Sequence, residues 1–300
     1  MYARNIESEL YEALADTPVV LLNGARQTGK STLVTRLAEK LDASYVTLDD
    51  ATTLAAATSD PVGFLKGMGQ CVAVDEAQKA PALFPAIKIL VDADRRPGRF
   101  LLTGSADVQM LPKVSESLAG RMEIKTLWPL SQGELLGCKE CFMDGLFRVT
   151  MPDLVEGDSN DLAARVAKGG YPEAVQRAEG KRRDAWYAAY ITAILQRDIR
   201  DLANIEGLTE MPRLLALLAT RLGGLLNMSE LSRASVIPHT TLKRYLALLE
   251  ASFLMKPLPA WHTHLGKRLV KSPKIHLVDT GLAAHLTGHS RQRLAADLNL

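Results

Sequence analysis

Apolar residues in the first part of the chain fall into short continuous runs separated by longer segments with helical spacing. The runs are rich in β-branched residues and predict five strands, at residues 19–22, 44–48, 71–76, 100–103 and 122–127. A short amphipathic pattern over residues 1–16 predicts a helix before the first strand. Because strands that alternate with helices at this spacing form parallel, helix-covered sheets, residues 1–128 are predicted to be an α/β domain.

The pattern changes after Pro129, where strand signals give way to helical spacing such as that of Trp186, Tyr190 and Ile194. We therefore expect a helical lid region over residues 129–220. Residues 221–275 then favour a winged helix, in which Ser229 caps a short helix and Thr240 caps a longer one over residues 241–255. Two apolar runs, 269–270 and 275–278, are interpreted as the strands of the wing.

Composition and charge exclude few classes of protein. Hydrophobic residues make up 47% of the 300, charged residues 23%, and the net charge is +2, which is ordinary for a globular protein. No apolar run is long enough to span a bilayer, so no membrane partner is expected. Early acidic residues such as Glu7 and Glu9 argue against a signal peptide, and three cysteines give no disulfide framework. A cytoplasmic location is predicted.

A complete G-x-x-x-x-G-K-[ST] phosphate loop follows the first predicted strand and opens a helix. Its glycines allow backbone N–H groups to surround a phosphate chain, and the helix N-terminus adds partial positive charge. Lys30 is expected to reach the β- and γ-phosphates, and the Ser31 hydroxyl to bind Mg²⁺. The predicted nucleotide-binding residues are Gly24, Ala25, Arg26, Gln27, Thr28, Gly29, Lys30, Ser31 and Thr32.

Two further strand ends carry polar residues suited to the same chemistry. The third strand ends in Asp75 and Glu76. Asp75 is predicted to hold Mg²⁺, and Glu76 to polarise the water that attacks the γ-phosphate. The fourth strand ends before Ser105, which would lie between the two motif strands and sense the γ-phosphate. A plain strand-to-loop turn is the alternative for Ser105.

Several motifs together resemble the prokaryotic AAA-type ATPases that carry a C-terminal DUF4143 region. The matching stretches are residues 22–31, 74–78, 102–105, 117–121, 169–173, 195–199, 271–274 and 278–282. The resemblance implies a P-loop fold with strand order 5-1-4-3-2, and ATP with Mg²⁺ as ligands. Chains of this family usually continue further, into a nuclease-like region. We therefore expect residues 276–300 to be the truncated start of the DUF4143 tail, and nuclease activity is not predicted.

Transition-state charge on the γ-phosphate requires a cation, for which the resemblance favours Arg121. Arg197 and Arg200 are the alternatives, and a surface ion pair is the non-functional interpretation of each. Whether Arg121 acts within its own subunit or on a neighbour in a homo-oligomer is left open.

The C-terminal segment suggests double-stranded DNA as a partner. Five cations and no acidic residue lie between positions 256 and 274. The predicted DNA-contacting residues are Thr241, Lys243, Arg244, Lys267, Arg268 and Lys271. The leading interpretation is an Mg²⁺-dependent ATPase that couples nucleotide state to DNA binding. The alternative is a signalling or defence switch that acts on a protein partner.

Overall fold

The computed structural model describes residues 2–105, 118–138, 140, 145–147, 159–199 and 209–296. The chain forms two compact units. The N-terminal unit is Arg4–Trp128, and the C-terminal unit is Pro129–Leu300 with Met1–Ala3. Within the described residues, no helix is both long and apolar enough to cross a membrane.

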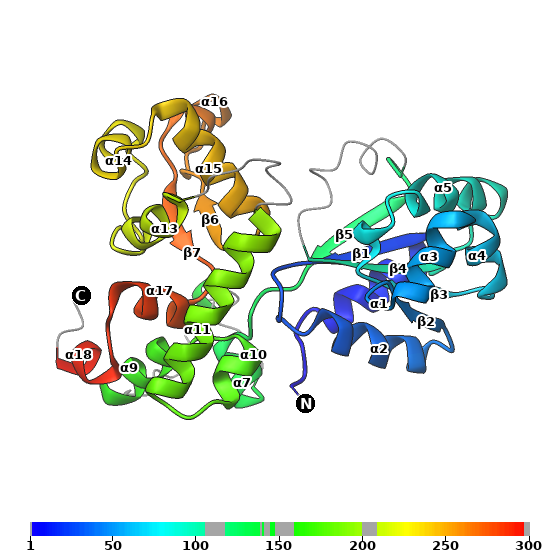
Figure 1. Ribbon diagram of the computed structural model, residues 1–300, viewed down its shortest axis with the longest axis horizontal. Helices are drawn as coiled ribbons and strands as arrows, with labels where there is room; N and C mark the ends of the chain where they lie inside the picture. The colour runs from blue at the N-terminus through cyan, green and yellow to red at the C-terminus, as the bar shows by residue number, and fades with distance from the viewer. Residues whose placement is uncertain are drawn as a thin grey trace. The chain divides into compact units, whose positions relative to one another are not determined.

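A five-stranded parallel sheet forms the centre of the N-terminal unit (Figure 1). Its strands are β1 (Val19–Asn23), β2 (Ser44–Thr47), β3 (Val72–Asp75), β4 (Phe100–Gly104) and β5 (Met122–Thr126). They pair in the order β2-β3-β4-β1-β5. Read from the other edge, this is 5-1-4-3-2, so the predicted strand order is confirmed.

Helices cover both faces of this sheet because apolar residues point alternately to either side of each buried strand (Figure 1). In β1, Val20 and Leu22 pack with α1 (Glu7–Asp16) and α2 (Lys30–Lys40). On the opposite face, Val19 and Leu21 belong to a second cluster. That cluster is completed by residues of α3 (Ala51–Ser59), α4 (Pro61–Gly67) and α5 (Leu83–Ala93).

The described residues of the C-terminal unit are mostly helical. Its helices are α7 (Gln132–Leu136), α9 (Ser159–Lys168), α10 (Pro172–Gln176), α11 (Lys181–Ala193), the π-helical turn η3 (Ile194–Asp198), α13 (Met211–Ala219), α14 (Met228–Ser235), α15 (His239–Ala251), α16 (Leu265–Val270), α17 (Thr280–Thr287) and α18 (Arg291–Ala296). Helix α17 packs against α9, α11 and α13. The segment predicted to be a tail is thus part of the same compact unit.

The helix starts predicted after residue 221 differ from those observed. Helix α14 begins after Asn227, whose side-chain oxygen accepts the Glu230 N–H at 3.1 Å, and not after Ser229. Asparagine caps helices as well as serine, which explains the shift. Helix α15 begins directly after the extended residue Pro238, so Thr240 lies inside the helix and does not cap it.

The two antiparallel strands that follow α15 also differ from the prediction. They are β6 (Met255–Leu258) and β7 (Lys274–Leu277), and Leu225 adds an isolated bridge to Lys274. Residues 269–270, predicted to be a strand, lie in α16. Leu265 and Leu269 are four positions apart, which is helical spacing and accounts for the difference.

A buried carboxylate joins two distant segments of the C-terminal unit. Asp279 accepts hydrogen bonds from the N–H of Gly170 at 2.6 Å, the N–H of Leu282 at 2.7 Å and the hydroxyl of Tyr187 at 2.9 Å. Burial and the Asp279 charge raise the pKa of Tyr187, which keeps its hydroxyl protonated as a donor. A Cβ at Gly169 would lie 2.4 Å from the Tyr187 hydroxyl, so glycine is required there.

We predict that Asp279→Ala lowers the unfolding free energy of the C-terminal unit by about 3 kcal/mol, because it leaves buried donors unpaired. Calorimetric unfolding measures this change. Asp184→Ala removes an exposed carboxylate from α11 and serves as the control, with an expected change below about 0.5 kcal/mol. Equal, small effects of the two substitutions would contradict this account of the buried network.

Candidate nucleotide-binding site

The loop of residues 24–29 joins β1 to α2 at the carboxyl edge of the sheet. Gly24 has φ +142°, and a Cβ there would lie 2.3 Å from the carbonyl oxygen of Leu127. Gly29, at φ +95°, precedes α2 and offers no side chain to cap it. The first-turn N–H groups of α2 are therefore left for an anion. The strand, loop and helix follow one another as the motif requires.

Lys30 lies beneath this loop with only 5% of its surface exposed. Its ammonium donates hydrogen bonds to the carbonyl oxygens of Gly24 and Ala25, each at 2.9 Å. Thr28 closes the loop with a hydrogen bond from its hydroxyl to the Ala25 carbonyl at 2.9 Å. An ammonium that the loop carbonyls hold at this position can bind the phosphate chain that the loop surrounds.

Asp75, at the end of β3, is oriented by two hydroxyl groups that the sequence analysis did not single out. The Thr103 hydroxyl donates to its Oδ1 at 2.5 Å, and the Tyr45 hydroxyl donates to its Oδ2 at 3.2 Å. Asp75 is only 3% exposed. Thr103 is a polar residue near the end of β4, which is otherwise apolar and pairs with β3. This position in the sequence could have indicated that Thr103 contacts Asp75.

Glu76 follows directly in a left-handed conformation, with φ 58°, which is uncommon for a residue with a side chain. Its N–H donates to the Thr103 hydroxyl at 2.9 Å. The Gln78 amide donates both to the Glu76 carboxylate and to the Ser105 hydroxyl, the latter at 3.0 Å. Ser105 and Glu76 are thus brought together through Gln78, a residue that sequence reasoning missed.

Arg4 fastens the phosphate loop to the end of the N-terminal unit. Its guanidinium donates to the carbonyl oxygens of Thr28 at 2.7 Å and Trp128 at 2.6 Å. Nothing in the sequence pattern distinguishes Arg4 from a surface arginine, because its two partners are backbone atoms separated from it by 24 and 124 positions.

Arg121 lies at the amino ends of the parallel strands, whereas the phosphate loop lies at their carboxyl ends. Its carbonyl oxygen accepts the N–H of Val19, at the amino end of β1, at 3.3 Å. Asn23, at the loop end of β1, is four residues further, about 13 Å along the strand. The Arg121 Nε pairs with Asp92 Oδ1 at 2.6 Å, and this hydrogen bond lowers the pKa of Asp92. The structure does not bring Arg121 to the phosphate loop of its own chain.

The two alternative arginines cannot be placed in the same way. The Arg197 side chain is outside the described residues, although its backbone lies in η3, and Arg200 lies outside the described residues altogether.

The residues at the carboxyl edge fit a magnesium–nucleotide complex. Ser31 lies exposed in the first turn of α2, and Asp75 is held at the end of β3; hydroxyl and carboxylate oxygens are ligands that Mg²⁺ prefers. Strand β4 separates β1 from β3 and places Thr103 between the two motif strands. The remaining loop positions, Arg26, Gln27 and Thr32, are half-buried or exposed.

The basic residues predicted to contact DNA lie on two elements of the C-terminal unit. Thr241, Lys243 and Arg244 are in α15, where Lys243 and Arg244 are exposed and Thr241 is half-buried. Lys267 and Arg268 belong to α16, and Lys271 follows it, exposed. The Lys267 side chain is outside the described residues.

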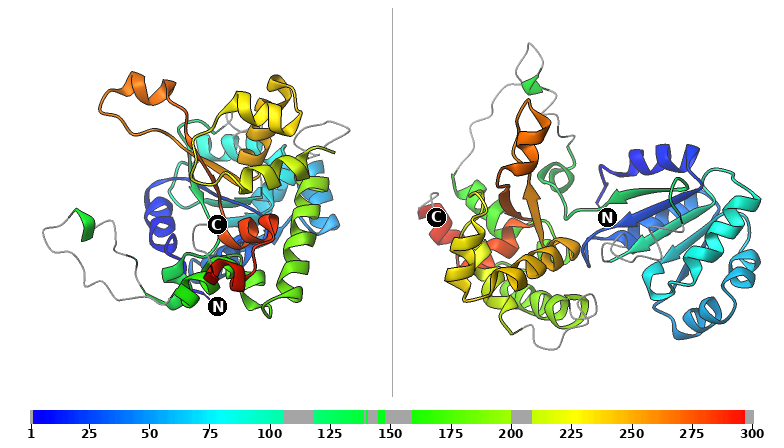
Figure 2. Two further views of the ribbon diagram at one scale, coloured as in Figure 1. Left: turned by 90° about the vertical axis from the view of Figure 1, so that its left-hand side faces the viewer. Right: turned by 90° about the horizontal axis from the view of Figure 1, so that it is seen from above.

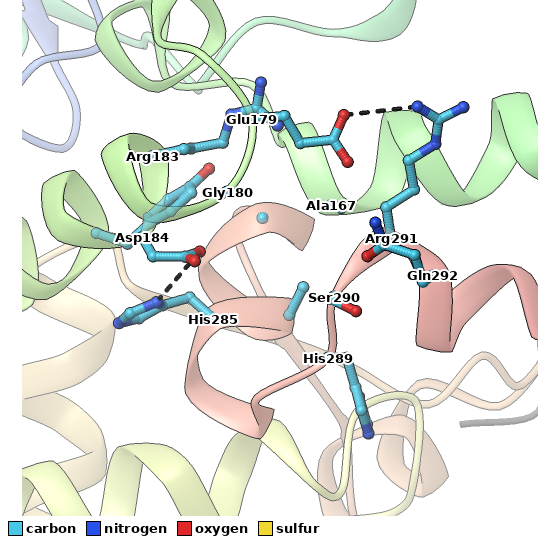
Figure 3. A pocket seen from close by; sticks show the side chains of 13 residues that line it. Ala167, Glu179, Gly180, Arg183, Asp184, His285, His289, Ser290, Arg291 and Gln292 are labelled. Atoms are coloured by element: carbon cyan, nitrogen blue, oxygen red, sulfur yellow. Dashed lines mark ion pairs between the residues drawn. The ribbon is translucent and has the colours of Figure 1, made fainter.

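The C-terminal unit also contains a cavity of about 380 Å³ (Figure 3). Arg291 pairs with Glu179 across it at 3.5 Å, and His285 Nδ1 lies 4.0 Å from Asp184 Oδ1. Burial lowers the pKa of His285, which favours its neutral form near pH 7. Because Arg291 is paired with Glu179 and the neutral form of His285 is favoured, these two side chains do not give the cavity the concentrated positive charge that a triphosphate requires.

We predict that Thr103→Val weakens Mg²⁺-dependent nucleotide affinity, because valine removes the hydroxyl that orients Asp75. Titration calorimetry with and without EDTA measures the effect, and loss of one such buried hydrogen bond corresponds to about a tenfold change. Affinity in EDTA is expected to change little. Thr126→Val, at the end of β5, is the control. An equal loss with and without Mg²⁺ would contradict a role through Asp75.

Two family models match the chain in separate regions. Residues 16–136 match the family described as an AAA domain. Residues 159–293 match a domain of unknown function, DUF8612. The resemblance had implied DUF4143 for the C-terminal part, and this label is not supported by the match.

Two curated relatives are similar over nearly the whole chain. They are uncharacterized proteins of Mycobacterium tuberculosis and Mycobacterium bovis, each 36% identical over 301 aligned residues. The alignment covers 99% of this chain and 62% of each relative. The chain therefore spans less than two thirds of the length of these relatives.

The fold is also similar to that of the Walker-type ATPase PABY2304 of Pyrococcus abyssi. The two share 15% sequence identity with a TM-score of 0.54, over 95% of this chain and 96% of that one. This likeness concerns the fold, in which the phosphate loop lies at the end of β1. The match over residues 16–136 shows that the N-terminal part of this chain is similar to AAA domains, and the likeness to the Walker-type ATPase agrees with it in fold.

Proposed function

We propose that the chain binds Mg²⁺-ATP at the carboxyl edge of its sheet and hydrolyses it to ADP and phosphate. The observation that carries this proposal is the convergence of a buried Lys30, beneath the phosphate loop, with Asp75, Glu76 and Ser105 at neighbouring strand ends. A buried cation and a buried carboxylate two strands apart complement a phosphate chain and its metal ion.

Each residue has a distinct role in this reaction. Lys30 and the N–H groups of the loop bind the phosphates, and Ser31 and Asp75 hold Mg²⁺, which neutralises developing charge. Glu76 orients and polarises the attacking water. Ser105 reports on the γ-phosphate, because Gln78 connects its hydroxyl to the Glu76 carboxylate.

Glu76→Gln is expected to lower kcat for ATP by about 100-fold or more while nucleotide affinity stays near wild type, because the amide cannot act as a general base. Phosphate release and equilibrium binding of a fluorescent ATP analogue measure the two quantities. Glu39→Gln, an exposed substitution on α2, is the control. Wild-type turnover in Glu76→Gln would remove Glu76 from the reaction.

Arg121 is proposed to act on the nucleotide of a neighbouring copy in a homo-oligomer. Its position at the amino end of the sheet supports action in trans over action in its own chain. Its pairing with Asp92 is a surface ion pair, and such pairs are weak because water screens them, so Arg121 can exchange Asp92 for a stronger partner.

We predict that Arg121→Ala and Lys30→Ala each lose ATP turnover, and that mixing the two restores part of it. In mixed oligomers, the Arg121→Ala subunit supplies an intact Lys30, and the neighbouring Lys30→Ala subunit supplies an intact Arg121 to that site. Phosphate release by the separate and mixed proteins measures this effect, and Arg95→Ala, at an exposed arginine nearby, is the control. Unchanged turnover in Arg121→Ala would exclude its role, and failure of the mixture to recover would exclude action in trans.

Residues 221–275 of the C-terminal unit are proposed to form a winged helix that binds double-stranded DNA. Two helices separated by a short turn precede the antiparallel pair β6 and β7, and Leu225 pairs with β7. Lys243 and Arg244 are exposed on the second helix, whereas its opposite face is buried through Leu242 and Leu246. This arrangement leaves a basic helical face for a groove.

The double substitution Lys243→Gln and Arg244→Gln is expected to weaken binding of a duplex and to reduce the slope of log affinity against log salt by about two, because two phosphate contacts are lost. Fluorescence anisotropy of a labelled duplex measures this slope. The control pair Lys181→Gln and Arg182→Gln removes two exposed cations from α11. Equal effects of the two pairs would show that DNA responds to the overall positive charge of the protein, and would contradict a binding site on α15.

The alternative, a nucleotide-dependent switch that acts on a protein partner, predicts a different outcome. In that case duplex DNA neither binds in a salt-dependent way nor changes ATP turnover, while nucleotide state changes assembly measured by light scattering. The exposed face of α15 is then a protein-binding surface.

A further inference from the structure

The segment between β6 and β7 carries two largely exposed apolar side chains. Figure 2 shows it, in orange, extending away from the helices of the C-terminal unit. Trp261 is 79% exposed and Val270 is 87% exposed, although each is costly to leave in water. We call residues 259–273 the projecting segment. A tryptophan that is kept exposed on such an extension is typical of a contact surface.

Arg268 holds the indole of Trp261 in a defined place. Its guanidinium lies 5.9 Å from the ring centroid, and its Nε donates to the carbonyl oxygen of His262. The short loop before α16 is also closed by the His264 N–H, which donates to His262 Nδ1 at 3.0 Å. The ring is thus supported by a cation and remains open to solvent over most of its surface, which is the arrangement that suits a stacking platform.

Charge and position identify the chemistry that would bind there. The projecting segment and its flanking strands contain five cations and no acidic residue, so they complement phosphates. Strand β6, at the base of the segment, packs against α15, whose exposed face carries Lys243 and Arg244. The segment therefore begins next to the helix that carries the residues proposed to bind duplex DNA.

Stacking distinguishes unpaired from paired nucleotides. In a duplex the faces of the bases are covered by their neighbours, so an indole can stack only where a strand is open. We propose that the projecting segment binds single-stranded DNA, with Trp261 stacking on an unpaired base and the surrounding cations holding the phosphates. The proposal rests on the DNA-binding function proposed above and extends it from duplexes to open strands beside them.

Binding of a labelled oligothymidylate to the full chain tests this proposal. The wild type is expected to bind it with salt-dependent affinity and with quenching of tryptophan fluorescence. Trp261→Ala is expected to lose about tenfold in affinity and most of the quenching, whereas Trp261→Phe retains most of the affinity. The other two tryptophans, Trp128 and Trp186, stay in place as internal references.

Val270→Ala is the matched control, because it removes an equally exposed apolar side chain from the same segment without a stacking face. It is expected to change affinity little. An equal loss in Val270→Ala and Trp261→Ala would overturn stacking as the mode of binding.

Two further measurements separate the possible failures. If a labelled duplex binds through Lys243 and Arg244 but oligothymidylate causes no Trp261-dependent quenching, the present proposal fails and the proposed duplex binding stands. If neither DNA binds, both fail. Sedimentation with phosphatidylserine vesicles that requires Trp261, in the absence of oligothymidylate quenching, would show that the segment binds membrane surfaces and would overturn the proposal.

Discussion

The ammonium group of Lys30 is buried beneath the loop between β1 and α2, against the carbonyl oxygens of Gly24 and Ala25. A buried cation in a phosphate loop is placed to bind the phosphate chain of a nucleotide, and neighbouring parts of the N-terminal unit shape this site. Gly24 lets the loop pass within contact of Leu127. The parallel sheet then places Asp75 at a nearby strand end.

A second buried charge organises the C-terminal unit. Asp279 caps α17 and accepts hydrogen bonds from Gly170 and Tyr187, which precede it by 109 and 92 positions, so distant segments depend on one carboxylate. Tyr187 belongs to a cluster with Trp186, at a ring separation of 5.0 Å. This fixed core supports the exposed surfaces of α15 and the projecting segment, which are free to serve in binding because they contribute little to it.

Much of this arrangement is predictable from the sequence because it is local or follows from one motif. The phosphate loop and the carboxylates at the end of β3 are short patterns, and the family resemblance that they help to carry implies the strand order that the structure confirms. Contacts between distant segments carry no such pattern. The roles of Thr103 and Arg4 were not predicted, because their partners become neighbours only after folding. The sequence also did not indicate that Arg121 lies at the end of the strands opposite to the phosphate loop.

A crystal structure of the chain with Mg²⁺ and a non-hydrolysable ATP analogue tests the central claim most directly. The account predicts that the triphosphate lies in the loop after β1, with the γ-phosphate against the Lys30 ammonium and Mg²⁺ beside Ser31 and Asp75. A nucleotide bound elsewhere, for example in the cavity beside Arg183 and His285, would contradict it. A loop that stays closed over Lys30 at saturating nucleotide would also contradict the account.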